Sequence, residues 1–249
     1  MPVLPAPAVP QMTSPERAAP SPVASFRHTA ILVALLIALG AWGFIASHRG
    51  ESPAGTSPAG AHRAPVVPVY LSLLLSEWGL VLYVWRSGLR RAGVPITALI
   101  GRAPRSGKSI IADVLIAAAI WGAVSAVAAG LRRIQGDAPA ALVESMLPRG
   151  PLEAALWIAL SLSAGFCEEL VFRGYLQRQF HALTGSPWLA LALQAVVFGV
   201  SHGYQGIAPC LRITLIAAFF GAVAQWRGSL RPVMMAHAWT DVAAGLLRL

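Results

Sequence analysis

The stretch LEAALWIALSLSAGFCEELVFRG, residues 152–174, decides the fold. It begins as a long apolar run and ends with two adjacent acids, Glu168 and Glu169, followed four residues after Glu169 by an arginine. Within residues 156–249 only one further acid, Asp241, occurs. A lone charge near the centre of a bilayer costs roughly 2.5–3.5 kcal/mol on insertion scales. Acids this costly in an apolar stretch indicate chemistry or transport.

The composition predicts an all-α, polytopic transmembrane helical bundle. Hydrophobic residues make up 56% of the 249 residues and charged residues 12%, whereas soluble domains carry about 25% charge. Apolar runs near or above the roughly 17–25 residues that cross a bilayer recur along the chain. We expect about seven spans, within a range of six to eight. The runs are residues 30–47, 66–85, 110–131, 152–172, 187–202, 209–226 and 232–247.

Three regions follow from these runs. Residues 1–27 are rich in Pro, Ala and Ser without apolar periodicity, so they predict a disordered tail. Residues 28–150 predict the first transmembrane helices and a basic loop. Residues 151–249 predict a helical core that carries the polar residues discussed below.

The net charge of +9 does not indicate nucleic-acid binding, because the basic residues lie at the ends of apolar runs. A basic loop between the second and third runs is attracted to anionic lipid headgroups and predicts a cytoplasmic side, which also places the amino terminus in the cytoplasm. The chain is rich in Ala and Arg and has a single lysine, which favours a bacterial cytoplasmic membrane. The basic loop contains Arg86, Arg90, Arg91, Arg102, Arg105 and Lys108.

Glu169 and Arg173 are four residues apart, so they share a helix face and can form an ion pair. Pairing lowers the cost of carrying both charges in an apolar surrounding. Glu168 is then the carboxylate without a partner on its own helix. A carboxylate in such a position suits a general base or acid.

His202 follows the next apolar run, with Phe198 one turn earlier on the same helix face. A turn centred on Gly185 joins the two runs, and Glu168 and His202 each lie seventeen residues from it. If both runs are continuous helices rising about 1.5 Å per residue, the carboxylate and the imidazole reach the same depth.

His237 and Asp241 lie four residues apart on the last run and share a helix face. With Glu168 and His202 they form a set of two imidazoles and two carboxylates, which suits either a metal site or acid–base catalysis without a metal. The zinc motif with two His and an intervening Glu on one helix does not occur. Two other acids in apolar runs, Glu77 and Asp113, are assigned no role at the site.

Three blocks in this order, Glu168-Glu169-x-x-x-Arg173, Phe198-x-x-x-His202 and His237-x-x-x-Asp241, resemble the CPBP intramembrane proteases. This family includes the CAAX prenyl endopeptidases and bacterial proteins linked to bacteriocin processing or immunity. The resemblance covers residues 151–249 and is carried by the combination of blocks, since each block alone is a weak signal.

The resemblance implies an intramembrane endopeptidase in which Glu168 and His202 activate water. It implies that His237 and Asp241 stabilise the oxyanion or hold a divalent metal. For a metal such as zinc, the possible ligands are Glu168, His202, His237 and Asp241. Glu169 and Arg173 would orient the site, with Phe198 in support. The partners implied are the bilayer and a peptide or membrane-protein substrate, whose identity and whose prenylation the sequence does not specify. A proton- or ion-coupled transporter, and a noncatalytic immunity or scaffold protein, remain alternatives.

Overall fold

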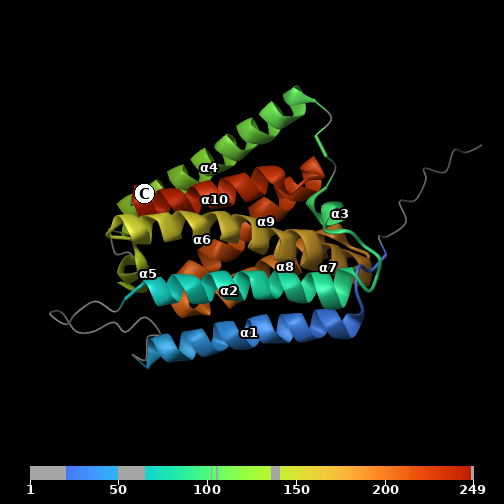
Figure 1. Ribbon diagram of the computed structural model, residues 1–249, viewed down its shortest axis with the longest axis horizontal. Coiled ribbons are helices and arrows are strands. Elements are labelled where there is room, and N and C mark those ends of the chain that lie inside the picture. The colour runs from blue at the N-terminus through green and yellow to red at the C-terminus, as the bar shows by residue number, and fades with distance from the viewer. Residues whose placement is uncertain (1–20, 50–64, 102, 105, 136–140, 248–249) are drawn as a thin grey trace, which may run out of the picture.

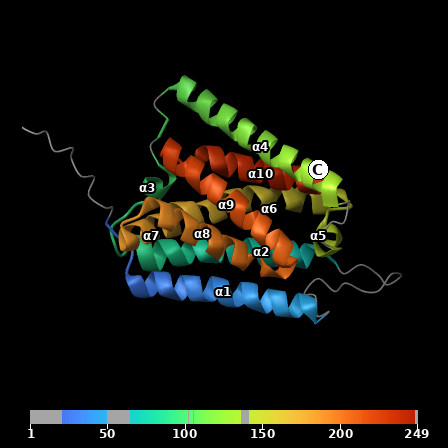
Figure 2. The same ribbon diagram turned by 180° about the vertical axis from the view of Figure 1, so that it is seen from behind.

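The computed structural model describes residues 21–49, 65–101, 103–104, 106–135 and 141–247. Within these ranges the chain forms helices and no β-strand, apart from an isolated bridge between Gly101 and Ser229. The long helices lie side by side as a bundle (Figure 1, Figure 2). The predicted fold class, an all-α helical bundle, is confirmed.

Each predicted apolar run contains a helix. The α-helices are α1 (Phe26–His48), α2 (Val67–Tyr83), α3 (Ile96–Ile100), α4 (Gly107–Gln135), α5 (Ala141–Met146), α6 (Pro151–Glu169), α7 (Gln177–Thr184), α8 (Pro187–Ser201), α9 (Ile207–Arg227) and α10 (Arg231–Leu246). The π-helical segments are η1 (Val84–Leu89) and η2 (Leu170–Leu176), and η3 (Gly203–Gln205) is a 3₁₀ turn.

Five helical segments of the described chain are long and apolar enough to cross a membrane. They are Phe26–Ser47, Val67–Leu89, Gly107–Leu131, Pro151–Thr184 and Ile207–Arg227. The helices α8 and α10 have 15 and 16 residues, which at about 1.5 Å per residue rise less than the roughly 30 Å of hydrocarbon. The protein is therefore an integral membrane protein by its apolar helices, and the count of seven spans stays a prediction.

The predicted tail and basic loop lie partly outside the described residues. Residues 1–20 of the tail are outside, as are Arg102 and Arg105 of the loop. The rest of the loop includes η1, which carries Arg86, and the short helix α3.

The end of the predicted tail is folded. The side-chain oxygen of Gln179 accepts hydrogen bonds from the backbone N–H groups of Val23 at 2.9 Å and Ala24 at 3.3 Å. Helix α1 begins at Phe26, and the Ser25 side chain caps it. Helix α1 thus begins two residues before the predicted boundary at residue 28, and a contact with α7 that sequence periodicity does not reveal holds the segment before it.

The hairpin between α7 and α8 forms at the predicted turn. Gly185 has φ of 69°, a left-handed conformation that glycine adopts without a steric penalty. Ser186 then caps α8, and Pro187 occupies its first turn. The first arm of the hairpin is not a continuous α-helix, however, because the π-helical segment η2 separates α6 from α7. Equal spacing from Gly185 therefore does not translate directly into equal depth.

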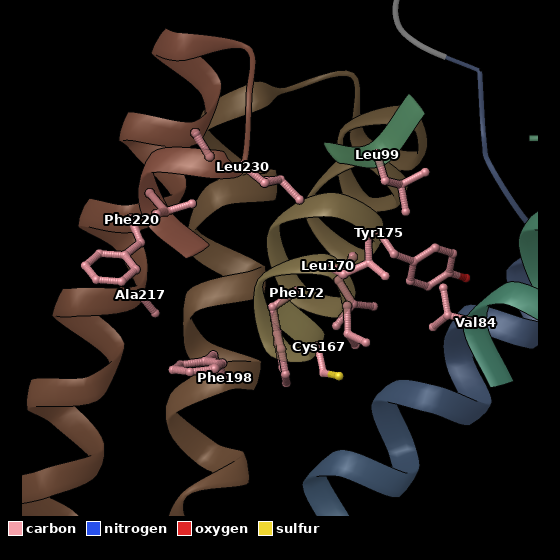
Figure 3. Close-up of a cluster of buried hydrophobic side chains, with 14 of the residues drawn as sticks. Val84, Leu99, Cys167, Leu170, Phe172, Tyr175, Phe198, Ala217, Phe220 and Leu230 are labelled. Carbon is pink, nitrogen blue, oxygen red and sulfur yellow. The ribbon is translucent and has the colours of Figure 1, made fainter. Parts of the chain in front are cut away.

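The largest buried cluster gathers where α6 passes into η2. Leu170, Val171 and Tyr175 are at most 1% exposed. Figure 3 shows side chains of this cluster contributed by several helices, with Phe172 of η2 and Phe198 of α8 packed against one another. The core thus surrounds the residues that directly follow Glu168 and Glu169.

Helices α6 and α10 approach each other closely, and α10 lies between α6 and α4 (Figure 1). A Cβ atom added to Gly165 would lie 2.7 Å from the Met234 carbonyl oxygen and 2.9 Å from the Ala238 backbone nitrogen. Further along the pair, the Trp157 indole N–H donates to the Asp241 carbonyl oxygen at 2.8 Å. Glycine at position 165 therefore permits the short distance between the backbones of α6 and α10, the helix that carries His237.

We expect Gly165→Ala to destabilise the protein by about 1–3 kcal/mol, because the added methyl group meets backbone atoms that cannot move without separating two helices. Thermal unfolding in detergent measures this loss. The matched control is Gly122→Ala in α4, where nothing lies within 4 Å of an added Cβ. Equal unfolding temperatures for the two variants would contradict the close approach of α6 and α10.

Candidate active site

A fully buried carboxylate lies at the centre of the polar cluster. Glu169 is 0% exposed, and its Oε1 accepts a hydrogen bond from Arg173 Nη1 at 2.9 Å. The same oxygen lies 2.8 Å from His237 Nδ1. The ion pair between Glu169 and Arg173 that their spacing predicts is therefore confirmed. One carboxylate joins the end of α6, the segment η2 and the helix α10.

The contact with Glu169 fixes how His237 is used. An ionised carboxylate can only accept hydrogen bonds, so Nδ1 of His237 carries a hydrogen and donates a hydrogen bond to Glu169. The other ring nitrogen, Nε2, lies 3.7 Å from Glu168 Oε2 and 3.5 Å from Asp241 Oδ2. Three carboxylates therefore surround one imidazole.

The exposure of these side chains is graded. The Glu169 side chain is fully buried, His237 is 14% exposed, Glu168 is 22% exposed and Asp241 is 36% exposed. The adjacent acids thus occupy different environments, because one residue along an α-helix turns the side chain by about 100°. Glu168 faces the accessible side of the cluster, and Glu169 faces the core.

His202 directly follows α8 as its C-cap residue, and it joins the cluster through Phe198. Its Nδ1 lies 2.8 Å from the Phe198 carbonyl oxygen, which can only accept, so Nδ1 donates this hydrogen bond. The other ring nitrogen, Nε2, takes no part in it. The Phe198 ring centroid lies 4.7 Å from that of His202 and 6.3 Å from that of His237. His202 is also within electrostatic range of the Asp241 carboxylate.

Phe198 also supports the buried ion pair. The Arg173 guanidinium carbon lies 4.4 Å from the Phe198 ring centroid and 5.7 Å from that of Phe220. A guanidinium above an aromatic face is attracted by the ring quadrupole, and the attraction is strongest where water is excluded. Arg173 is 3% exposed, so these rings replace part of its hydration.

The π-helical segment η2 is a feature that the sequence reasoning missed. It begins directly after Glu169 and includes Arg173. Short π-helical insertions in α-helices occur frequently at functional sites. The apolar pattern of this segment carries no signal that separates a π-helical turn from an α-helical one.

Glu77 and Asp113, which the sequence leaves without a role, have different surroundings. The Ser163 hydroxyl donates to Glu77 Oε2 at 2.6 Å, and Glu77 is within electrostatic range of Glu168, His237 and Asp241. Glu77 therefore belongs to the surroundings of the cluster, on α2. Asp113 accepts a hydrogen bond from Arg227 Nε at 2.8 Å and joins α4 to the end of α9.

The donor types of the cluster suit a divalent metal, but their positions do not. Carboxylates and imidazoles are zinc ligands, and a ligating His usually donates its other N–H to a carboxylate, as His237 does to Glu169. Across the described part of the chain, however, no group of three or more His, Cys, Asp or Glu residues is arranged to hold a metal ion. The predicted metal set thus stays a prediction, and the geometry supplies no coordination on which to base a step.

The fold and the cluster together define a helical membrane protein with a buried carboxylate–imidazole site, a set of groups that suits hydrolysis. Residues 150–243 match the family model described as type II CAAX prenyl endopeptidase Rce1-like. The matched segment contains α6 to α9 and most of α10, with all the predicted site residues. The resemblance expected from the three sequence blocks is confirmed for this segment, which is similar to a family of intramembrane proteases. No curated protein and no solved structure matches the chain.

We expect Arg173→Ala to lower the free energy of unfolding by about 3–5 kcal/mol, because it leaves the Glu169 carboxylate buried with one cationic partner fewer. Thermal unfolding in detergent measures the loss. Arg212→Ala, an exposed arginine on α9, is the control and should change stability by about 0.5 kcal/mol or less. An Arg173→Ala variant as stable as wild type would show that the ion pair is not a structural requirement.

Proposed function

We propose that the protein is an intramembrane endopeptidase that hydrolyses a peptide bond with a water molecule activated by Glu168 and His202. The observation that carries the proposal is the arrangement around His237, whose Nε2 faces Glu168 at 3.7 Å and Asp241 at 3.5 Å while Nδ1 is held by Glu169. The match to an intramembrane protease family over residues 150–243 supports the same reaction class.

In this reaction Glu168 takes a proton from water as the water oxygen attacks the carbonyl carbon of the peptide bond. The developing oxyanion accepts a hydrogen bond from an imidazole, and its stabilisation there lowers the barrier. Glu168 then returns the proton to the leaving amine as the carbon–nitrogen bond breaks, which balances the hydrolysis. General acid–base catalysis of this kind contributes about 10²–10⁴-fold in rate.

Glu169 and Arg173 act in the proposal as positioning residues. Glu169 fixes the ring of His237 and its proton on Nδ1, and Arg173 compensates the buried charge. For His237 to donate a hydrogen bond to the oxyanion, its Nε2 must also carry a proton. Glu168 and Asp241 are the carboxylates nearest to this nitrogen. His202 keeps Nε2 outside its bond to the Phe198 carbonyl oxygen, and in the proposal this nitrogen acts with Glu168 on the water.

A metal-assisted form of the reaction is the second candidate. The hydrogen bond from His237 Nδ1 to Glu169 is the arrangement in which metal-bound histidines are commonly held, and this observation favours it. Because the described residues offer no set of three ligands around one point, Glu168, His202, His237 and Asp241 would have to move to hold the ion. A zinc ion held there would supply Lewis-acid chemistry.

The substrate in this proposal is a peptide segment of a membrane-associated protein. A helical peptide in lipid protects its amides by its own hydrogen bonds, so the segment must be unwound where it meets Glu168.

The basic residues near η1 support a cytoplasmic amino terminus in a bacterial cytoplasmic membrane.

Cleavage of a peptide library by the purified protein in detergent tests the function. We expect Glu168→Gln to reduce cleavage by about 100-fold or more, because the amide cannot accept the proton from water. Glu153→Gln is the matched control, since it removes a carboxylate from the same helix near its start. Unchanged cleavage in Glu168→Gln would reject this site, and no cleavage by any variant would favour the transporter or scaffold alternatives.

Chelator treatment separates the two forms of the reaction. We expect wild-type cleavage to persist after incubation with EDTA and dialysis, because the described residues offer no cluster of three metal ligands. The rate of peptide hydrolysis before and after treatment measures this. Loss of cleavage that zinc restores, with Glu168→Gln inactive throughout, would instead assign a metal to the site.

A further inference from the structure

A cavity of about 180 Å³ lies behind the site, beyond Arg173 from Glu169. It is bounded by α7, the end of α9 and the turn before α10, with Leu99 of α3 closing one side. Figure 3 shows Leu99 and Leu230, two of its lining residues, at the same end of the buried cluster. At about 30 Å³ for each water molecule of the liquid, this volume holds several water-sized groups.

The lining of this cavity is cationic. Arg173, Arg178 and His181 all line it, and no acid does among the described residues. Arg178 and His181 lie three residues apart on one face of α7. In the described chain, Arg178 forms no hydrogen bond or ion pair, unlike Arg173 on the site side. The cavity therefore has a guanidinium available for an anion.

A second observation points to a ligand. Arg173 is 3% exposed, and although its Nη1 binds Glu169, its Nε is buried without a hydrogen-bond partner in the described residues. A buried donor without a partner costs about 1–3 kcal/mol, and more for a charged group. An oxyanion in the cavity would offer Arg173 and Arg178 acceptors in one place.

The residues beside the cavity are of the kind found at the headgroup level of a membrane. Gln225, which lines it, donates to the Pro187 carbonyl oxygen at 3.0 Å and so joins the end of α9 to the start of α8. The adjoining residues Trp188 and Trp226 are 72% and 75% exposed. Tryptophan is enriched at the membrane–water interface. Figure 1 and Figure 2 both show the end of α9 leading into the start of α10.

We propose that the cavity between α7 and the α9–α10 turn binds the phosphate group of an anionic membrane lipid through Arg178, with Arg173 as its buried wall. Arginine binds phosphate through a planar fork of N–H donors. Basic pockets between transmembrane helices are suited to anionic headgroups. Free phosphate shares this chemistry, and the experiment below separates the two sources.

The test is lipid binding to the purified full-length protein in dodecyl maltoside, followed by native mass spectrometry. The probes are dioleoylphosphatidylglycerol and, as the zwitterionic comparison, dioleoylphosphatidylcholine. We expect wild type to prefer phosphatidylglycerol and Arg178→Gln to weaken its binding by about tenfold or more. Arg86→Gln, which replaces an exposed arginine in η1, is the matched control and should change binding by about twofold or less.

Inorganic phosphate identifies the source of the anion. Competition by millimolar phosphate against phosphatidylglycerol would assign the cavity to phosphate in either form, and lack of competition would assign it to the lipid. Equal losses in Arg178→Gln and Arg86→Gln, or no loss in Arg178→Gln, would overturn the proposal. Unfolding temperatures without lipid check that each variant folds. If Arg178→Gln does not fold, Arg178→Met keeps an unbranched apolar stem without the guanidinium, and binding equal to wild type would then overturn the phosphate contact.

Discussion

The buried carboxylate of Glu169 is the constraint on which the site depends. A charge with 0% exposure is stable only when partners replace its hydration, and Glu169 has two, Arg173 and His237, on one oxygen. The first partner lies on the same helical segment, and the second comes from α10. Satisfying this one group therefore sets the rotation of α6 against α10, which the close contact at Gly165 makes possible.

This constraint gives the two adjacent glutamates different roles in the fold. Because Glu169 is used within the core, the helix turns Glu168 to the side where His237 Nε2 and Asp241 lie. Neither role can be exchanged without rotating α6 by about 100°, which would expose the ion pair and bury an unpaired charge. The order of the two acids in the sequence is thus as important as their presence.

Local spacing predicted part of this arrangement. The fourth-residue spacing of Glu169 and Arg173, and of His237 and Asp241, indicates contacts that a single helix enforces, and both are present. The hydrogen bond between Glu169 and His237 joins residues 68 positions apart, and no periodicity encodes it. The same holds for Ser163 and Glu77, and for Gln179 and the segment before α1. The π-helical turn η2 was also unpredictable, because its residues, apolar apart from Arg173 and Gly174, carry no signal that separates a π-helical turn from an α-helical one.

The graded exposure of the cluster indicates the direction from which water reaches it. Exposure falls from Asp241 through Glu168 and His237 to Glu169, so the open side is that of Asp241 and the closed side is that of Arg173. Arg173 is packed under Phe198 and Phe220, which exclude water from the closed side. Water admitted from the open side therefore meets Glu168 before it meets the buried ion pair. In the proposed reaction, this separation would hydrate Glu168 while keeping dry the carboxylate that orients His237. Hydrolysis inside an apolar bundle would then not weaken the contact that holds α6 and α10 together.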